Sequence, residues 1–422
     1  MRPEITTLAN GLRVVSHTMP HLETFALGLW VGAGARHETL PEHGISHLLE
    51  HMAFKGTARR TARRIAEEIE EAGGGINAAT GLESTAYFAR ALKGAEAVVL
   101  DIMADILQNS LLSEEDLTRE RDVILQEIAG IADSPEELVF ELAQNAAFPD
   151  QAVGRPIIGT PDSIARLGAR ELGNFLAEHY TAPRIVLAAA GAIVHDTLVR
   201  HAEALFGGFK PGAECTAEPA RYAGGSRASE KPFEQCHLVL NFAGPSYLDP
   251  HFYTAQIFSG LFGGSASSRL FQEVRENRGL CYAISSTAWG LADAGIFGIH
   301  AATGTKAMGE LVDVIGHELT KAASQRPGEA EVARAKAQFK AGTLMSLESS
   351  SARTEQMASQ LLALGRLIPR EETVARIDAV TPEAVRALAE RVVTGAPPTA
   401  AVVGAGRRSQ QYAEQAARLG AD

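Results

Sequence analysis

The sequence predicts an α+β protein made of two homologous α/β-roll domains, each with a mixed or antiparallel sheet covered by helices, together forming a clamshell. Three observations lead to this prediction. Short strand-like segments alternate with amphipathic helical segments along the whole chain. A stretch rich in proline and glycine interrupts the pattern at 210–235. The pattern of the first half then returns about 211 residues later.

The first half begins with Asn10-Gly11, a dipeptide typical of a two-residue hairpin turn. Thr61 can cap a helix that Gly73 ends, and Ser113 with Asp116 resembles a capping box. The elements predicted for this half are, in order, strands at 4–8, 12–16 and 25–31, helices at 44–56 and 62–72, two strands within 76–92, helices at 94–109 and 113–132, further helical segments to 180, a strand at 185–190 and a helix at 196–206.

Residues 210–235 show little apolar periodicity, so we predict a linker there between a domain at 1–209 and a second domain at 236–422. The strand predicted at 236–242 is the counterpart of the strand at 25–31. Two further pairs of segments are similar at a comparable offset: 160–175 with 372–388, and 186–191 with 400–406. Two copies of one α+β unit of about 200 residues explain this repetition.

The composition is that of a soluble globular protein, with 422 residues of which 45% are hydrophobic and 21% charged. A net charge of -12 argues against nucleic-acid binding and weakly favours basic ligands. Three cysteines are too few for a disulfide framework and fit a reducing compartment. No signal peptide, transit peptide or apolar run of membrane-spanning length is visible, so we expect a cytoplasmic location and no membrane span.

The segment His47-Leu-Leu-Glu-His51 carries the clearest chemical signal. On a helix, His47, Glu50 and His51 share one face, where two imidazoles can hold a divalent metal and a carboxylate can reach a water beside it. The order is the H-x-x-E-H pattern of inverted zinc peptidases. His43 lies four residues earlier, but Gly44 follows it, so we expect His43 in the loop before the helix.

The repeat provides an internal comparison for this segment. At the offset of about 211 residues, the two histidines and the glutamate are replaced by Phe258, Leu261 and Phe262. The fold therefore does not need polar groups at these positions. Burying three polar groups without partners would cost about 1–3 kcal/mol each, and a bound metal would supply the missing partner.

A catalytic zinc takes three protein ligands and keeps one position open, so a third ligand must come from elsewhere. Glu120 and Glu127 are two turns apart on one face of the helix predicted after Ser113. Spacing alone does not choose Glu127 over other carboxylates, which include Glu67, Glu71 and Glu83.

The chain resembles the pitrilysin/insulinase family of zinc metallopeptidases, especially its bacterial branch that is similar to mitochondrial processing peptidases. The runs that carry the resemblance extend over nearly the whole chain: 7–14, 44–57, 77–80 with Tyr87, 120–127, 267–271 and 275–282. The family resemblance implies a zinc-dependent endopeptidase that hydrolyses unfolded peptides or short polypeptides inside an enclosed chamber, with one Zn²⁺ per chain.

Carried over position by position, the resemblance also implies roles. His47, His51 and Glu127 would be the zinc ligands, Glu120 would orient a ligand histidine, and Glu50 would be the general base. In the second half, Tyr282 would donate to the oxyanion and Arg275 would hold substrate; without the resemblance, a core tyrosine and a surface arginine are the simpler interpretations. Asn77 and Ala78 would lie on an edge strand that pairs with the peptide substrate, where a simple turn is the alternative.

Some members of this branch divide the metal motif and the Arg/Tyr pair between two subunits, whereas this chain carries both. We therefore expect a homodimer and leave open a heteromer with a related subunit. Two other functions compete with catalysis: a non-catalytic structural subunit of the same fold, and a peptide-binding module that holds zinc only structurally. The complete residue set, Glu50 included, argues against both.

Overall fold

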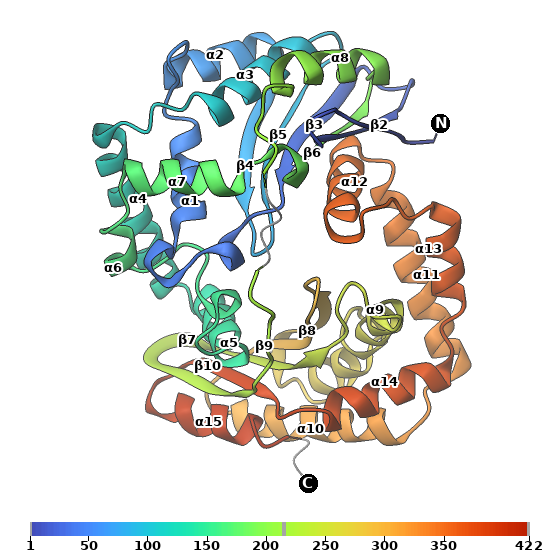
Figure 1. The fold of residues 1–422 in the computed structure, drawn as a ribbon. Helices are drawn as coiled ribbons and strands as arrows, with labels where there is room; N and C mark the ends of the chain where they lie inside the picture. Colours follow the sequence, from blue (N-terminus) through green and yellow to red (C-terminus); the bar gives the residue numbers. More distant parts are fainter. Residues whose placement is uncertain (1, 213–216, 420–422) are drawn as a thin grey trace. The chain divides into compact units, whose positions relative to one another are not determined.

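A computed structural model describes residues 2–212 and 217–419, and it confirms an α+β fold with two mixed sheets (Figure 1). The chain divides into two compact units. The first unit holds the described parts of 1–128, 156–218 and 344–367, and the second unit those of 129–155, 219–343 and 368–422. Among the helices of the described ranges, none is both long and apolar enough to cross a membrane.

The sheet of the first unit has six strands in the order β1-β2-β6-β3-β5-β4. Only the β2–β6 pair is parallel, and β4 is an edge strand that pairs with β5 alone. Every residue of β6 and nearly every residue of β3 is buried, as expected for the central strands of a sheet covered on both faces. The strands are β1 Glu4–Thr7, β2 Arg13–Thr18, β3 Thr24–Val31, β4 Gly75–Thr80, β5 Thr85–Leu92 and β6 Ile185–Gly191.

The sheet of the second unit has the order β10-β7-β9-β8, which matches β6-β3-β5-β4 strand for strand. Residues 225–229 of β7 run parallel to β10, while 237–241 pair with it in the opposite direction. Thus β10 lies between two arms of one long strand, as β6 lies between β2 and β3. This shared topology confirms that the two halves are homologous. The strands are β7 Gly225–Gly244, β8 Cys281–Gly290, β9 Gly295–Thr303 and β10 Thr399–Ala405.

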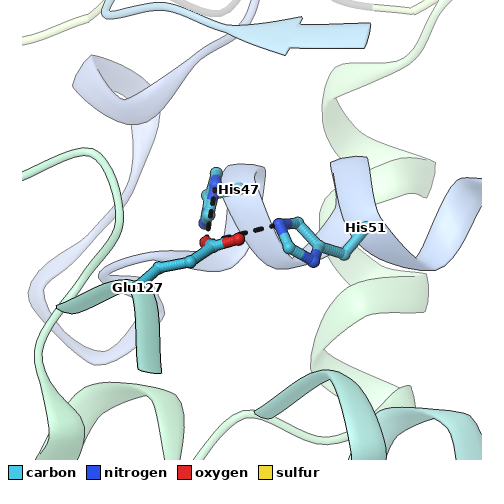
Figure 2. A group of neighbouring side chains, drawn as sticks. All are labelled: His47, His51 and Glu127. Atoms are coloured by element: carbon cyan, nitrogen blue, oxygen red, sulfur yellow. Dashed lines mark ion pairs between the residues drawn. The ribbon is translucent and has the colours of Figure 1, made fainter. Parts of the chain in front are cut away.

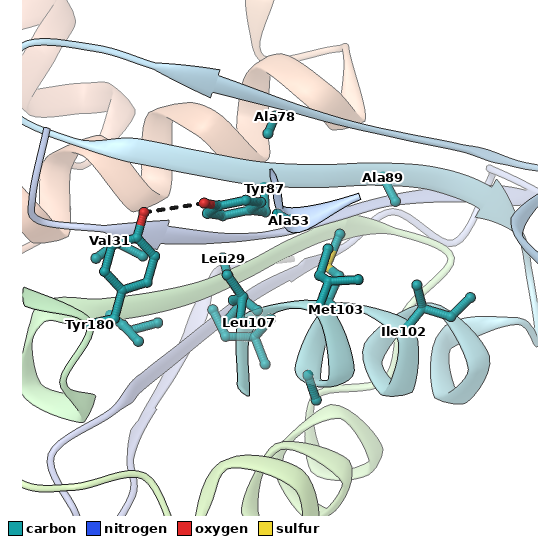
Figure 3. Packing of buried hydrophobic residues seen from close by; sticks show 14 of the residues in the cluster. Leu29, Val31, Ala53, Ala78, Tyr87, Ala89, Ile102, Met103, Leu107 and Tyr180 are labelled. Atoms are coloured by element: carbon teal, nitrogen blue, oxygen red, sulfur yellow. Dashed lines mark hydrogen bonds between the residues drawn. The ribbon is translucent and has the colours of Figure 1, made fainter. Parts of the chain in front are cut away.

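Helices cover both faces of the first sheet. Leu29 and Tyr87 of the sheet pack with Met103 and Leu107 of α3 in one large buried cluster (Figure 3). The opposite face packs on α12, drawn in orange beside β2 and β6 in Figure 1. The helices of the first unit, with α4 extending beyond it, are α1 Ile45–Ala53, α2 Ala62–Glu71, α3 Glu96–Gln108, α4 Glu114–Asp133, α6 Pro161–Ile164, α7 Ala169–His179, α8 His195–Phe206 and α12 Ser350–Leu364.

The second sheet is covered in the same way. Its main core includes Phe258 and Phe262 of α9, the apolar counterparts of the histidine positions, and both are buried. Its other face packs on α5, through Val139 and Ala143. The remaining helices are α5 Pro135–Ala147, α9 Phe252–Phe262, α10 Met308–Ser324, α11 Glu329–Ser346, α13 Arg370–Asp378, α14 Pro382–Thr394 and α15 Ser409–Ala416.

These packings change the predicted domain boundaries of 1–209 and 236–422. Residues 129–155 belong to the second unit and 344–367 to the first, so each half of the chain lends one helical segment to the other unit. The physical reason is that each sheet has a second apolar face, which the helices of its own half leave uncovered. The predicted linker at 210–235 also differs, because 225–235 form the first arm of β7; residues 213–216 of that linker lie outside the described residues.

Candidate metal centre

The N-terminus of α1 is held by a glycine and a carboxylate. Gly44 has φ 91°, and a Cβ there would lie 2.7 Å from a methyl carbon of Ile164 and 2.9 Å from Cα of Gly159. The buried carboxylate of Glu38 accepts hydrogen bonds from the backbone N–H groups of Gly44 at 2.8 Å and Ser46 at 2.9 Å. An anion at this position satisfies free N–H groups and complements the helix dipole.

The two faces of α1 differ as the sequence predicts. One face is apolar and buried, with Ile45, Leu48, Leu49 and Met52 in the first core. The other face carries His47, Glu50 and His51, which are half-buried. The apolar side therefore anchors the helix, and the histidines and glutamate project from its opposite side.

The segment after α1 is tied to α3 by a buried carboxylate. Asp105 has no exposed surface, accepts a hydrogen bond from the Thr57 hydroxyl at 2.7 Å and forms an ion pair with Arg60 at 2.9 Å. Breaking one member of such a buried pair is costly, because it leaves the remaining charge uncompensated. This cluster fixes the position at which the histidine helix ends.

Helix α4 supplies the two predicted carboxylates. The Ser113 hydroxyl accepts from the backbone N–H of Asp116 at 3.2 Å, as the predicted capping box requires. Leu117, Glu120 and Ile124 form the buried face of the helix. Glu127 lies two turns after Glu120, and its side chain is 41% exposed, so it lies at the edge of this face.

Three predicted ligands converge at one point (Figure 2). Oε2 of Glu127 is 3.8 Å from Nε2 of His47 and 3.7 Å from Nε2 of His51. The two imidazole rings lie edge to face, with centroids 4.7 Å apart. One ligand atom from each residue lies within 4.8 Å of the other two. His43 is not part of this group; it is buried, and its Nε2 contacts the carbonyl oxygen of Pro156 at 2.8 Å.

The donor set fits one divalent metal ion. Separations of 3.7 and 3.8 Å are ion-pair distances and too long for hydrogen bonds. An ion pair requires a protonated imidazole, whereas the lowered pKa of His47 favours its neutral form, so a metal ion is the better partner for this group. Two imidazole nitrogens and one carboxylate oxygen form the ligand set of a catalytic zinc site that keeps a fourth position open.

His51 is oriented by a second carboxylate. Its Nδ1 lies 3.0 Å from Oε2 of Glu120, and the other oxygen of Glu120 forms an ion pair with Nζ of Lys55 at 2.6 Å. A proton on Nδ1 of His51 leaves the lone pair of Nε2 directed at the cluster. Glu120 therefore lies where the resemblance expects it, and Lys55 is an additional partner.

Burial keeps His47 neutral. Burial and, as the smaller cause, the neighbouring His51 together lower the pKa of His47 to about 4. A neutral imidazole is the form that binds a metal. The environment of His47 thus favours the ligating form over the whole physiological pH range.

Glu50 contacts the end of β4. The Thr80 hydroxyl donates to Oε2 of Glu50 at 2.6 Å. The same hydroxyl lies 3.3 Å from the carbonyl oxygen of Ser46, one turn earlier on α1. Glu50 therefore sits beside the three converging residues, on the same helix as both histidines, with one of its oxygens held.

Asn77 and Ala78 lie on the edge strand β4, and not in a turn. The side chain of Ala78 is buried in the first core, whereas the Asn77 side-chain oxygen accepts from the backbone N–H of Ala78 at 2.9 Å. An edge strand offers backbone groups to an added peptide strand. The Asn77 amide occupies one such group in this structure.

Arg275 and Tyr282 belong to the second unit, where they lie together. The guanidinium of Arg275 is 5.0 Å from the Tyr282 ring centroid and 4.7 Å from that of Phe271. Tyr282 is 77% exposed, so it is not a core residue of β8. The β8–β9 register shifts between Cys281 and Ala283, and such a bulge redirects the side chain at its centre.

Three contacts of this site lack a signal in the sequence. Glu38 caps α1 from a preceding loop, Lys55 holds Glu120, and Thr80 contacts Glu50 from a strand. Lys55 and Thr80 lie within runs that carry the family resemblance, but their partners are distant in the chain.

Comparisons with known proteins agree with the family resemblance seen in the sequence. Residues 13–161 match the family model described as "Insulinase (Peptidase family M16)", and residues 166–339 match "Peptidase M16 inactive domain". An "Uncharacterized zinc protease" of Rickettsia felis is 38% identical, over 95% of this chain and 97% of its own. A "Probable mitochondrial-processing peptidase subunit beta" of Arabidopsis thaliana is 35% identical, over 92% of this chain and 76% of its own.

Solved structures share the fold. A peptidase M16 inactive domain from Pseudomonas fluorescens superposes with a TM-score of 0.88 at 20% identity, covering 96% of this chain and 98% of that one. A protease from Helicobacter pylori gives a TM-score of 0.87 at 21% identity, covering 95% of this chain and 99% of that one.

Proposed function

The chain belongs to the insulinase family of peptidases, peptidase family M16, and from this premise we propose that it is a zinc-dependent endopeptidase acting on extended polypeptides. The observation that carries the proposal is the convergence of His47, His51 and Glu127 beside Glu50. The name "zinc protease" borne by the Rickettsia felis relative supports the choice of metal.

In the proposed site, His47, His51 and Glu127 hold the zinc ion, one per chain, and Glu120 orients His51. A bound zinc ion supplies a Lewis acid and makes hydroxide available near neutral pH. The protein's own contribution is to keep His47 neutral and to direct both imidazoles at one point.

Glu50 acts as the general base and then as the general acid. Its carboxylate accepts a proton from the attacking water and returns it to the nitrogen of the leaving amine. The half-buried position of Glu50 and its hydrogen bond with Thr80 support this role, because a proton carrier needs a fixed geometry.

The substrates proposed are unfolded peptides and short polypeptides. The edge strand β4, which carries Asn77 and Ala78, can pair with an extended chain, and a folded protein cannot readily supply such a strand. In the second unit, Tyr282 is proposed to donate to the oxyanion and Arg275 to hold the substrate; the exposure of Tyr282 supports a role outside the core. The enclosed chamber stays a prediction from the resemblance.

The Glu50→Gln variant tests the proposal. We expect it to bind zinc at the wild-type stoichiometry and to cleave a quenched fluorescent peptide about 100-fold or more slowly, because a proton carrier is lost without a change in shape. Elemental analysis and initial rates measure both quantities. Equal turnover by the variant and the wild type, at equal zinc content, would reject the mechanism.

The proposed assembly is a homodimer, since one chain carries both residue sets. The Arabidopsis relative is named as a subunit, so a heteromer with a related chain is the alternative. Light scattering coupled to gel filtration of the purified protein distinguishes a dimer from a monomer. An inactive monomer that gains peptidase activity only with a second, related chain would favour the heteromer.

A further inference from the structure

We propose that Thr80 is a positioning residue for Glu50: its hydroxyl holds one oxygen of the carboxylate and thereby selects the other oxygen as the one that carries the proton. The inference rests on the proposed role of Glu50 as the general base. It adds a residue whose contribution comes from a hydrogen bond, without contact to the reacting atoms.

The geometry connects a strand end with one face of a helix. Thr80 is the last residue of β4, and its Oγ1 is 2.6 Å from Oε2 of Glu50 and 3.3 Å from the carbonyl oxygen of Ser46. Ser46 and Glu50 are one turn apart on α1, so a single hydroxyl reaches both. The strand therefore fixes the Glu50 side chain relative to the helix that carries both histidines.

The hydroxyl of Thr80 has only one proton to donate. The contact of 2.6 Å with Glu50 is in the range of a hydrogen bond from a hydroxyl to a carboxylate, whereas 3.3 Å to Ser46 is long. A carboxylate has no proton to offer, so Thr80 must be the donor in this pair. The Ser46 carbonyl is then the weaker of its two acceptors.

This arrangement makes the two oxygens of Glu50 unequal. Oε2 is occupied by Thr80, while Oε1 makes no hydrogen bond or ion pair with any residue of 2–212 or 217–419. In the proposed reaction, an O–H bond of water breaks as a new O–H bond forms at Oε1 and the water oxygen bonds to the carbonyl carbon of the substrate. The C–N bond then breaks as the same proton passes from Oε1 to the leaving nitrogen. Thr80 keeps its own proton throughout, so the proton balance involves only water, Glu50 and the amine.

Thr80 is itself held in place. It pairs with Thr85 of the neighbouring strand β5. Thr85 is fully buried, and its hydroxyl donates to the carbonyl oxygen of Ala33 at 2.9 Å. Two residues after Thr85 on β5, Tyr87 is buried, and its hydroxyl lies 3.2 Å from that of Tyr180 (Figure 3). A β-branched residue has few χ1 rotamers available to it, and the hydrogen bond to Glu50 selects one of them. The donor is thus pre-oriented before substrate binds.

Two substitutions separate the hydroxyl from the shape of the side chain. Thr80→Val keeps the β-branched shape and removes the donor, and Thr80→Ser keeps the donor and removes a methyl group. For Thr80→Val we expect kcat to fall about 10- to 100-fold with KM within about threefold of wild type, because only the orientation of the proton carrier is lost. For Thr80→Ser we expect kcat within about threefold of wild type.

Three further measurements accompany the kinetics. Zinc content and melting temperature should stay at wild-type values in both variants. A crystal structure of zinc-free Thr80→Val should show the Glu50 side chain displaced from its wild-type rotamer, and that of Thr80→Ser should show it retained. If Thr80→Val fails to fold, Thr80→Ala replaces it, with the same expected fall in kcat and the same rescue by serine.

The outcomes are decisive. Wild-type kcat in Thr80→Val, or an equal fall in Thr80→Val and Thr80→Ser, would overturn the inference, because the hydroxyl would then have no special part. An unchanged Glu50 rotamer in zinc-free Thr80→Val would overturn it as well. Failure of the proposed function itself looks different: the zinc-loaded wild-type protein would cleave no peptide at all.

Discussion

Lys55 is linked to the candidate metal centre through its ion pair with Glu120. Its ammonium lies 2.6 Å from the carboxylate of Glu120, which in turn contacts Nδ1 of His51 at 3.0 Å. The chain of contacts runs from a half-exposed cation to a buried carboxylate and then to a proposed zinc ligand. Since outer partners fix the orientation of ligand histidines, Lys55 should contribute to zinc affinity without touching the metal.

We expect Lys55→Met to weaken zinc binding about 10-fold, because Glu120 loses the cation that balances its charge. Competition with a fluorescent chelator measures the affinity. Lys93→Met is the matched control, since Lys93 is a 61%-exposed lysine of the same unit whose ion pair with Glu23 is 3.9 Å long. If the Lys55 and Lys93 variants bind zinc equally well, Lys55 has no part in the site.

Tyr282 shows how a local irregularity in a strand can expose a side chain. The bulge between Cys281 and Ala283 leaves Tyr282 outside the regular alternation of β8, and the side chain is 77% exposed. Its ring lies beside the Arg275 guanidinium. Because the bulge directs the Tyr282 phenol into solvent, this phenol is available to a ligand, whereas the phenol of a core tyrosine is not.

For Tyr282→Phe we expect kcat to fall about 100-fold with KM largely unchanged, because a hydrogen-bond donor to the oxyanion acts only in the transition state. Steady-state kinetics on one peptide provide both constants. Tyr247→Phe, at another exposed tyrosine of the second unit, should leave both unchanged. A kcat for Tyr282→Phe at the wild-type value would remove Tyr282 from the proposed mechanism.

Helices α5 and α12 occupy equivalent places in the two units, each covering the second face of a sheet. In the first unit, Met357, Ala358 and Leu361 of α12 pack against Trp30 and neighbouring strand residues. Helix α5 comes from the first half of the chain but belongs to the second unit, and α12 comes from the second half but belongs to the first unit. The stability of the first unit therefore depends on a segment about 160 residues beyond its last strand.

Met357→Ala should destabilise the protein by about 2–5 kcal/mol, the usual cost of removing a fully buried methionine side chain. Met345→Ala is the control: Met345 belongs to the same segment but is 64% exposed, and its removal should change stability by about 0.5 kcal/mol or less. Urea unfolding followed by circular dichroism measures both. Similar midpoints for the two variants would show that α12 does not stabilise the first unit.

The molecule as a whole should lose stability in mild acid. Burial lowers the pKa of His37 to about 4, and the charge of Arg184 acts in the same direction. The unfolded chain, with an ordinary histidine pKa near 6.5, therefore binds a proton over a range in which the folded protein does not. Folding stability is full above pH of about 6.5 and decreases as the pH falls towards 4.

The contribution of His37 is about 3 kcal/mol over that range. We expect the free energy of unfolding to decrease between pH 7 and pH 4.5, and His37→Asn to flatten this dependence. Urea titrations at several pH values measure the slope. A variant with the same pH dependence as the wild type would show that His37 does not protonate on unfolding.

Much of the site could be predicted because its residues are close in the chain. His47, Glu50 and His51 lie on one helix, whose spacing alone places them on a common face. Glu127 and Glu120 needed the family resemblance, since spacing does not bring α4 to α1. Glu38, Lys55 and Thr80 were not predicted, because their roles depend on contacts with distant partners.

The amino-acid sequence by itself determined the α+β class, the repeat and the polar face of the histidine helix, since these depend on local propensity and on periodicity. Only the tertiary structure decided which helix covers which sheet. Residues 129–155 and 344–367 pack on the sheet of the other half, because an apolar sheet face can be covered by any segment of suitable shape. The same reason applies to the contact between Thr80 and Glu50. It joins the end of a strand to a helix, and the periodicity of the sequence does not predict which strand lies beside which helix.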